Sequence, residues 1–302
     1  MLMIRSAVGT LKFDSCFWLS THFPMGVQSR IIHFKHADTK TLIGLLGLIV
    51  VVAGVAHGVI PAYAESITLL ACSAAIIGVQ LDRYRRRKDD DEATRRHHQA
   101  AIYLYNTLSV RRALPPYTGW AASPELCGHI LDAIRNHHPE TIVEAGGGVS
   151  SVVVGYALEE QGHGRLVSLD HMEEYASVTR RRVSQHGLQD VVSVRHAPMT
   201  NIQIRGNAWP WYDLHAIDDL KTIDMLIIDG PPEQTRTQAR YPAVPALHDR
   251  LSDDAVVILD DAYRKDETAI VERWQAEDAR WTLTLLESPD GTAMLHRGST
   301  AP

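Results

Sequence analysis

The feature that most constrains the fold is an alternation of short apolar runs with amphipathic stretches, which begins at Thr141. The apolar runs have the length of strands and are hydrophobic almost throughout: TIVEAGG, RLVSLD, VVSVRHA, DMLIIDG and AVVILDD. Strands separated by helices form βαβ units, and strands without polar alternation belong to sheets covered on both faces. We therefore predict an α/β fold with a doubly wound, mostly parallel sheet.

The last part of the chain follows a different pattern. Two strand-like runs, WTLTLLE and TAMLHR, flank the turn sequence Ser-Pro-Asp-Gly at 288–291. Two such runs joined by a proline- and glycine-containing turn are typical of a β-hairpin. The sheet is therefore expected to close with a C-terminal antiparallel hairpin.

Composition excludes several classes of protein. The 302 residues carry 30 basic and 36 acidic side chains, a formal net charge of −6, so a nucleic-acid-binding polycation is not expected. Three widely spaced cysteines exclude a disulfide scaffold or a cysteine zinc site and fit a reducing compartment. There is no Gly-x-Ser-x-Gly elbow and no Gly-Lys-Ser/Thr phosphate loop, so a hydrolase or nucleotidase has little support.

Two apolar segments near the N-terminus predict a two-helix membrane hairpin at 41–81. The first, Thr41–Ile60, has only Thr41 and His57 as polar residues and would span a hydrocarbon core of about 30 Å as a helix. The second, Ala62–Leu81, is weaker, because its convincingly apolar part is Ile67–Val79. The alternative is a buried hairpin of two soluble core helices.

The charges that flank this hairpin predict its orientation. Lysines and arginines lie before the first segment and after the second, but none lies between them: Arg30, Lys35, Lys40, Arg83, Arg85, Arg86, Arg87 and Lys88. The positive-inside rule then places the protein in the cell (inner) membrane with its C-terminal domain facing the cytoplasm. The basic block after the hairpin would lie against anionic lipid or form a solvated stretch of helix. We expect four parts: an extension at 1–40, the hairpin at 41–81, a juxtamembrane helical linker at 82–118 and the α/β domain at 119–298.

Candidate binding residues follow the first predicted strand. Glu144 precedes three glycines, of which Gly146 and Gly148 let the backbone turn and approach a ligand, and the helix that starts near Ser150 presents its amides. As a dinucleotide fingerprint the loop lacks its third glycine, because Ser151 stands there. It fits an S-adenosylmethionine loop better, with Glu144 receiving the ligand's ammonium group. A tight turn without a ligand is the remaining alternative.

The second and third predicted strands end in further candidates. Asp170 would hold both hydroxyls of an adenosine ribose, or would instead cap the following helix. His171 and His196, also at strand ends, would touch the ligand or be ordinary surface histidines. Residues 197–199 would flank an adenine ring, or Met199 would pack in the core.

The fourth and fifth predicted strands end in three carboxylates, Asp229, Asp260 and Asp261. Clustered acids repel, so they need a cation, a proton or an arginine nearby. A divalent ion held there would orient and acidify a substrate hydroxyl. In the alternative, Arg264 and Lys265 neutralise the cluster and no metal is needed.

The segment from about Tyr103 to His296 resembles class I S-adenosylmethionine-dependent methyltransferases of the bacterial "methyltransferase domain 24" type. The motifs that carry the resemblance are GWAASPE, VEAGGGVSS, VSLDHMEEYA, WYD, IDMLIIDGPP, ARYPAVPAL and VVILDDAYRKDE. It implies a Rossmann-like sheet with a reversed final strand. Carried over onto this sequence, the expected cofactor contacts are Glu144, Gly146, Gly148, Ser150, Asp170, His171 and Asp229.

By similarity to catechol-type O-methyltransferases, Asp229, Asp260 and Asp261 would hold Mg²⁺. This sequence departs from that pattern, because Asp261 replaces the usual asparagine and Gly-Pro-Pro follows Asp229. The metal therefore remains one of two alternatives.

These observations predict a membrane-anchored, cytosol-facing methyltransferase that uses S-adenosylmethionine to methylate an oxygen of a small-molecule, sugar or lipid-linked acceptor. Asp229 and Asp260 are the expected catalytic residues. Trp211 and Tyr212 would form a wall of the acceptor site, or would instead serve the hydrophobic packing of their loop, which is the more common reason for such residues. The rival hypotheses are an NAD-dependent oxidoreductase on the same fold and a catalytically inactive membrane scaffold. No nucleic-acid partner is expected.

Overall fold

A computed structural model describes residues 61–298 and five single helical residues before them: Gly44, Gly47, Val51, Val55 and Gly58. The chain forms two compact units, Met1–Asp82 and Arg83–Pro302. The predicted extension at 1–40 lies outside the described residues, as does nearly all of the first predicted membrane segment.

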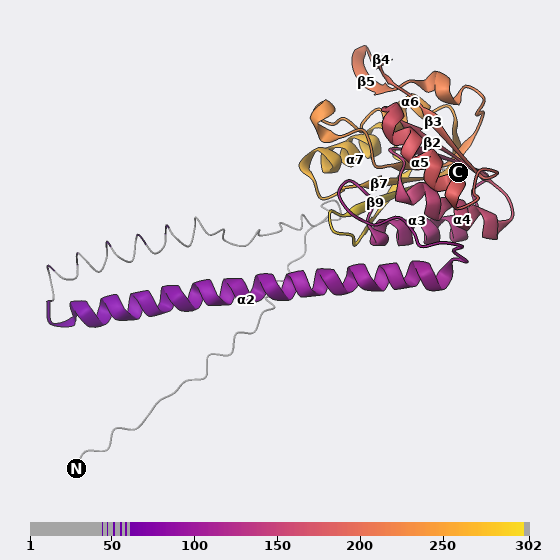
Figure 1. Cartoon of the computed structure of the whole chain (residues 1–302). Helices are drawn as coiled ribbons and strands as arrows, with labels where there is room; N and C mark the ends of the chain where they lie inside the picture. Colours follow the sequence, from indigo (N-terminus) through magenta and orange to yellow (C-terminus); the bar gives the residue numbers. More distant parts are fainter. Residues whose placement is uncertain are drawn as a thin grey trace. The chain divides into compact units, whose positions relative to one another are not determined.

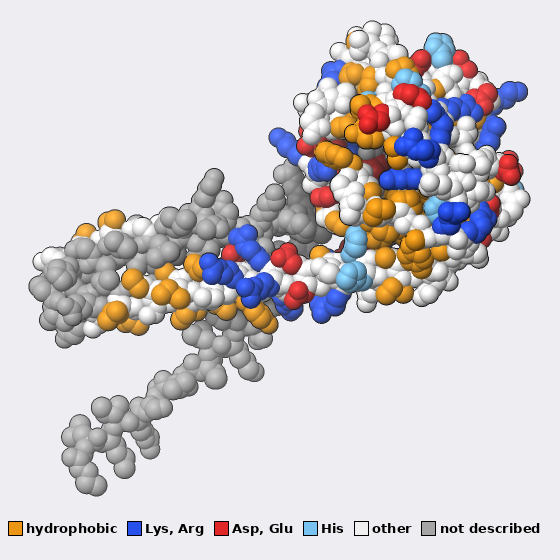
Figure 2. Space-filling view, in the orientation of Figure 1, with side chains coloured by type: hydrophobic (Ala, Val, Ile, Leu, Met, Phe, Trp, Pro, Cys, Tyr) orange, Lys and Arg blue, Asp and Glu red, His pale blue; other side chains and the backbone are white. Residues whose placement is uncertain are grey.

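Helix α2, Pro61–Thr107, is one continuous helix of 47 residues (Figure 1). It covers both the second predicted membrane segment and most of the predicted linker. Apolar side chains on its first half are exposed, among them Leu69, Leu70, Ile76 and Ile77. Figure 2 shows basic side chains gathered along the helix beyond these apolar ones.

Within the described part of the chain, no helix has both the length and the apolar character needed to cross a membrane. The predicted crossing by Ala62–Leu81 is therefore not supported. This segment continues into the polar residues of α2 instead of ending as one arm of a hairpin.

The α/β domain is built on a seven-stranded sheet in the order β3-β2-β1-β6-β7-β9-β8 (Figure 1). The first five strands in that order pair in parallel, β9 pairs antiparallel with β7, and β8 pairs antiparallel with β9. The strands are β1 (Thr141–Ala145), β2 (Arg165–Asp170), β3 (Val192–His196), β6 (Ile223–Ile228), β7 (Leu251–Asp260), β8 (Trp281–Leu286) and β9 (Thr292–Arg297). The predicted doubly wound sheet with a C-terminal antiparallel hairpin is confirmed.

Hydrophobic cores lie on both faces of this sheet. Successive side chains of β1 alternate between them, so Ile142 belongs to one core and Val143 to the other. The first core packs α3 (Pro124–His137) and α4 (Val149–Gln161), and the second packs α6 (Ala243–Leu247) and α7 (Lys265–Glu277). Helix α5 (Glu173–Gln185) contacts β2 and β3. Burial on both faces explains why the strands are apolar throughout.

A second, two-stranded sheet was not predicted. It is a hairpin of β4 (Met199–Ile204) and β5 (Asn207–Tyr212). Its turn residues, Arg205 and Gly206, have φ angles of 51° and 79°, which suit the tight turn of a two-residue hairpin. Trp209 and Trp211 of β5 lie in the second core, so the hairpin covers that side of the main sheet.

The strand order places a reversal point at β1. From β1 the chain winds outward through β2 and β3, then returns to the other side of β1 and continues through β6 and β7. Open α/β sheets bind ligands beyond the carboxyl ends of the strands at such a point. The residues at the ends of β1, β2, β6 and β7 therefore surround the expected binding site.

Candidate active site

A cavity of about 740 Å³ lies at this edge of the sheet. Eight of the site residues predicted from strand ends line it: Gly146, Gly148, Ser150, Asp170, His171, Asp229, Asp260 and Asp261. The predicted cofactor contact Glu144 is not part of the cavity wall. Loops that precede α3 and β9 complete the cavity, with Trp120, Pro289 and Asp290.

Gly146 is required by the fold itself. Its φ angle is +91°, and a Cβ there would lie 2.9 Å from the backbone nitrogen of Gly230. The loops after β1 and β6 thus touch through their backbones, and the amide of Asp229 donates to the carbonyl of Ala145 at 2.9 Å. No side chain fits between two backbones at that distance.

We expect Gly146→Ala to lower the free energy of unfolding by about 2–4 kcal/mol, because it combines a left-handed φ angle with a backbone clash. Denaturant titration of the full chain measures this. Gly148→Ala is the matched control and should change stability by less than about 1 kcal/mol. Equal stability of the two variants would contradict the close packing of the two loops.

Gly148 differs from Gly146, because the space beside it is open. Its φ angle of 178° is extended backbone, and a Cβ there would meet no atom within 4 Å. It immediately precedes α4, whose first residues Val149 and Ser150 also line the cavity. The open space above Gly148 lets a ligand approach the N-terminal amides of α4, which favour a negatively charged group.

Glu144 lies beneath this loop and not in the cavity wall. Its side chain is fully buried and accepts a hydrogen bond from Ser151 Oγ, which in turn accepts from the Gly148 amide at 3.1 Å. Burial raises the pKa of Glu144, and hydrogen bonds from neighbouring serines oppose this shift. The carboxylate is thus placed to hold the glycine loop through Ser151, and direct contact with a ligand's ammonium group stays a prediction.

Asp170 lies at the carboxyl end of β2 and lines the cavity beside His171. One carboxylate oxygen accepts from the Met172 amide at 2.9 Å. Met172 is itself the N-cap of α5, which has no side-chain cap hydrogen bond, so Asp170 does not cap this helix as the alternative predicted. The His171 ring lies 3.6 Å from the same oxygen. Burial raises the pKa of Asp170. The second oxygen is available for a polar ligand in the cavity.

The three aspartates at the ends of β6 and β7 come together as predicted. One carboxylate oxygen of each lies within 4.8 Å of the others. Arg264 contacts Asp261 at 2.8 Å, which agrees with the predicted alternative of an arginine neutralising the cluster. A second arginine, Arg240, contacts Asp261 at 2.7 Å and was not predicted.

Burial and mutual repulsion raise two of these acid pKa values. Burial is the main cause for Asp229, whose pKa lies well above its usual value, and the neighbouring Asp260 adds to it. The pKa of Asp260 is raised to about 6, again mainly by burial and then by Asp261. Asp260 is therefore a carboxylate that exchanges its proton close to neutral pH, as a general base does.

Three predicted ligand contacts lie elsewhere. Ala197 and Trp211 are buried in the second core, and Met199 begins β4, so none of them lines the cavity. The predicted adenine and acceptor roles of these residues are corrected accordingly, because the unpredicted β4–β5 hairpin draws them inward. Tyr212, predicted together with Trp211, does line the cavity. His196 is not part of the cavity wall.

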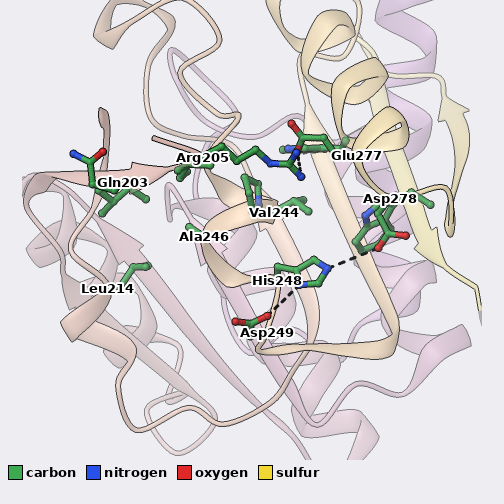
Figure 3. Close-up of a pocket in the computed structure, with 14 residues that line it drawn as sticks. Gln203, Arg205, Leu214, Val244, Ala246, His248, Asp249, Glu277 and Asp278 are labelled. Carbon is green, nitrogen blue, oxygen red and sulfur yellow. Dashed lines mark hydrogen bonds and ion pairs between the residues drawn. The ribbon is translucent and has the colours of Figure 1, made fainter. Parts of the chain in front are cut away.

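A smaller cavity of about 460 Å³ lies between β4, α6 and the end of α7 (Figure 3). Its charged side chains are already matched: Arg205 lies 3.6 Å from Glu277, and His248 lies 3.2 Å from Asp249 and 3.9 Å from Asp278. Figure 3 shows these pairs joined across the cavity. None of the predicted site residues lies here, so the larger cavity is the candidate active site.

Residues 143–262 match the model of a family described as a methyltransferase domain. This interval covers less than half of the chain, yet it contains every predicted site residue from Glu144 to Asp261. The match bears out the resemblance to methyltransferases stated from the motifs. No curated protein matches the chain.

Several solved structures are similar to the chain. The SAH-bound methyltransferase PaMTH1 of Podospora anserina is 14% identical, with 67% of this chain and 95% of that one covered and a TM-score of 0.48. TomG of Streptomyces achromogenes, an O-methyltransferase involved in tomaymycin synthesis and solved with SAM, is 17% identical, with coverages of 69% and 99% and a TM-score of 0.47.

An O-methyltransferase of Bacillus cereus in complex with SAH is 20% identical, with 61% of this chain and 84% of that one covered and a TM-score of 0.42. All of these TM-scores lie below 0.5. The likenesses therefore carry no weight for function, which is inferred below from the family match and the cavity.

Proposed function

We propose that the chain is an S-adenosylmethionine-dependent methyltransferase that methylates an oxygen of a small-molecule, sugar or lipid-linked acceptor. The observation that carries the proposal is the coincidence of the family match at 143–262 with the larger cavity. The residues present fit the cofactor, because the space above Gly148 is open and Asp170 offers a carboxylate oxygen in the same cavity.

The cavity residues divide between the two ends of this ligand. The first amides of α4, reached over Gly148, would bind its carboxylate, and Asp170 would accept hydrogen bonds from its ribose hydroxyls. S-adenosylmethionine supplies an electrophilic methyl group on a sulfonium. The acid cluster lies at the ends of β6 and β7, next to the backbone contact between Gly146 and Gly230. Donor and acceptor would thus meet at the centre of the sheet edge.

Asp260 is the proposed general base. In the described part of the chain no lysine or arginine nitrogen lies within 4.0 Å of its carboxylate, whereas Asp229 has Arg240 at 3.7 Å and Asp261 has it at 2.7 Å. Asp260 would take the proton of the acceptor hydroxyl while the new oxygen–carbon bond forms and the carbon–sulfur bond breaks. Asp229 would orient the hydroxyl. Most of the acceleration would come from aligning donor and acceptor in line.

Calorimetric titration of the full chain with S-adenosylmethionine and S-adenosylhomocysteine tests the proposal. We expect saturable one-to-one binding of both. A separate titration with NADH, monitored by NADH fluorescence, should show no binding. Fluorescence changes with NADH and none with the sulfur ligands would favour the oxidoreductase. Absence of binding by all three ligands would favour the inactive scaffold.

We further propose that the N-terminal unit attaches the protein to a membrane with the α/β domain on the cytoplasmic side. The support is the apolar sequence Thr41–Ile60, the exposed apolar side chains on the first half of α2, and the exposed basic residues that follow them. Lysine and arginine beside an apolar segment favour the anionic cytoplasmic leaflet.

Alkaline extraction of membranes from cells that make the full chain tests this attachment. The protein should stay with the membrane pellet. A second variant has glutamine in place of Arg83, Arg85, Arg86, Arg87 and Lys88. It should also stay in the pellet, but in protease-protection assays a larger fraction of its α/β domain should lie on the non-cytoplasmic side. Release of the unchanged protein into the supernatant would contradict membrane anchoring.

A further inference from the structure

Arg240 occupies the centre of the acid cluster. Only 4% of its side chain is exposed, and one of its terminal nitrogens lies 2.7 Å from Asp261 Oδ2 and 3.7 Å from Asp229 Oδ1. Its two terminal nitrogens also donate to the backbone carbonyls of Asp260 and Asp229, at 3.0 and 3.1 Å. A single guanidinium thus joins the ends of β6 and β7 and contacts or adjoins all three aspartates.

Further charges fix this arrangement. Arg264 contacts the same oxygen of Asp261 at 2.8 Å, so two guanidinium groups share it. On its other side Arg240 faces the buried Glu267, whose carboxylate lies 3.9 Å from Nε. Asp261 itself is held in the left-handed region, with φ at +61°, which directs its carboxylate toward these arginines. Buried charges are retained when they are paired in this way.

A divalent cation does not fit beside this guanidinium. Mg²⁺ and Ca²⁺ bind carboxylate oxygens at about 2.0–2.6 Å. An ion bound by all three aspartates would therefore lie within a few ångströms of Arg240, in a buried place where repulsion between positive charges is weakly screened. Arg240 cannot leave without breaking its bonds to both strand ends. The acids need positive charge, and the protein's own side chains already supply it.

We propose that Arg240 is the resident cation of this cluster, so that the chain holds Asp229 and Asp261 in place and works without a divalent metal ion. Arg240 is a positioning residue: it holds the carboxylates of Asp229 and Asp261 close to itself. In the described part of the chain, the Asp260 carboxylate has no arginine nitrogen within 4.0 Å. The role in catalysis rests on the proposed methyltransferase function, whereas the cation site is a property of the folded chain and is tested separately.

The test is titration of the full chain with Mn²⁺, followed by electron paramagnetic resonance, together with thermal unfolding in EDTA or in millimolar Mg²⁺. We expect no saturable Mn²⁺ binding up to about 1 mM and unfolding temperatures that agree within about 1 °C. One-to-one Mn²⁺ binding that disappears in Asp260→Asn would overturn the proposal.

Arg240→Gln gives the complementary measurement, because it leaves three acids without their central cation. We expect Mg²⁺ at about 5 mM to raise the unfolding temperature of this variant by several degrees. The matched control is Arg182→Gln, which removes a positive charge from the same cavity wall and should show no response to Mg²⁺. If the Arg240→Gln protein folds but its unfolding temperature does not change with Mg²⁺, the proposal is contradicted. If this variant does not fold, Mn²⁺ titration of the unchanged chain decides.

The same samples separate the two proposals. Calorimetry with S-adenosylmethionine in EDTA should give the same affinity as in Mg²⁺. Absence of donor binding in both buffers would contradict the proposed function but would not affect the proposal that Arg240 is the cation of the cluster. Mn²⁺ binding with intact donor binding would remove the resident-cation proposal alone.

Discussion

Asp170→Ala is expected to weaken S-adenosylmethionine binding by about 10- to 100-fold. Hydrogen bonds to a charged group contribute about 1.5–3 kcal/mol each, and 1.4 kcal/mol corresponds to a factor of ten in affinity. Asp170 lines the cavity, and its Oδ1 accepts from the Met172 amide and lies 3.6 Å from the His171 ring. Its free oxygen is therefore the group that a ribose would engage. Calorimetric titration measures the change.

The control for this prediction is Glu144→Gln. Glutamine still accepts the hydrogen bond of Ser151, and Glu144 does not line the cavity, so donor affinity should change by no more than about threefold. Unfolding curves of both variants exclude a general loss of structure. If Glu144→Gln lost donor binding and Asp170→Ala kept it, the carboxylate contact would have been assigned to the wrong strand end.

Asp260→Asn is expected to lower methyl transfer by about 10²- to 10⁴-fold while leaving the donor affinity unchanged. An amide cannot accept the proton of the acceptor hydroxyl, but it fills the same space. In the unchanged protein the rate should fall as the pH drops below about 6, because Asp260 becomes protonated there. Single-turnover rates across a pH series measure both effects. Once an acceptor is known, an unchanged rate in Asp260→Asn would exclude it as the base.

The same variant has a predictable effect on stability. The pKa of Asp260 rises from 3.8 to about 6 on folding, so folding favours its protonated form. That contribution is complete below about pH 4 and is lost as the pH rises through 6. At pH 7.5 the ionised side chain costs on the order of 3 kcal/mol, because the pKa rises by roughly two units and one unit corresponds to about 1.4 kcal/mol.

Asp260→Asn should therefore unfold at a higher temperature than the unchanged chain at pH 7.5, and the difference should shrink toward pH 4. Scanning calorimetry at the two pH values checks the sign. Asp219→Asn is a suitable control, because an exposed ion pair with Arg195 lowers the pKa of Asp219 and the pH dependence should run the other way. A larger gain at pH 4 would contradict the raised pKa of Asp260.

The main sheet could be predicted from sequence because burial on both faces makes its strands apolar throughout. The β4–β5 hairpin has a weaker sequence pattern. Spacing by two holds for Ile202 and Ile204 in β4, whereas β5 is apolar from Ala208 to Tyr212 and contains Pro210, so the strand pattern is obscured. Trp211 therefore packs in the core instead of forming a ligand wall.

Site residues could be predicted where their position at the end of a strand places them in the cavity. They were harder to predict where side-chain packing decides which residue points inward. Asp170 and Asp260 are the last residues of their strands and Asp229 directly follows its strand, so the sheet topology alone brings them together. Glu144 lies one residue before a strand end, on the same face as Ile142, so alternation turns it beneath α4. The alternation of side chains along β1 was the sequence signal that could have predicted the burial of Glu144. Arg240 lies in a polar segment with Arg236, and nothing local indicates which arginine turns inward.

The contact between Gly146 and Gly230 has a consequence for how the acceptor range of this protein can change. Because the two loops meet backbone to backbone, neither can be lengthened or reshaped without disturbing the other. The loops that precede α3 and β9 reach the same cavity from outside the central sheet edge and carry the exposed Trp120 and Asp290. If the proposed function holds, exchange of these outer loops would admit new acceptors while the loops after β1 and β6 keep their contact and the donor site is preserved.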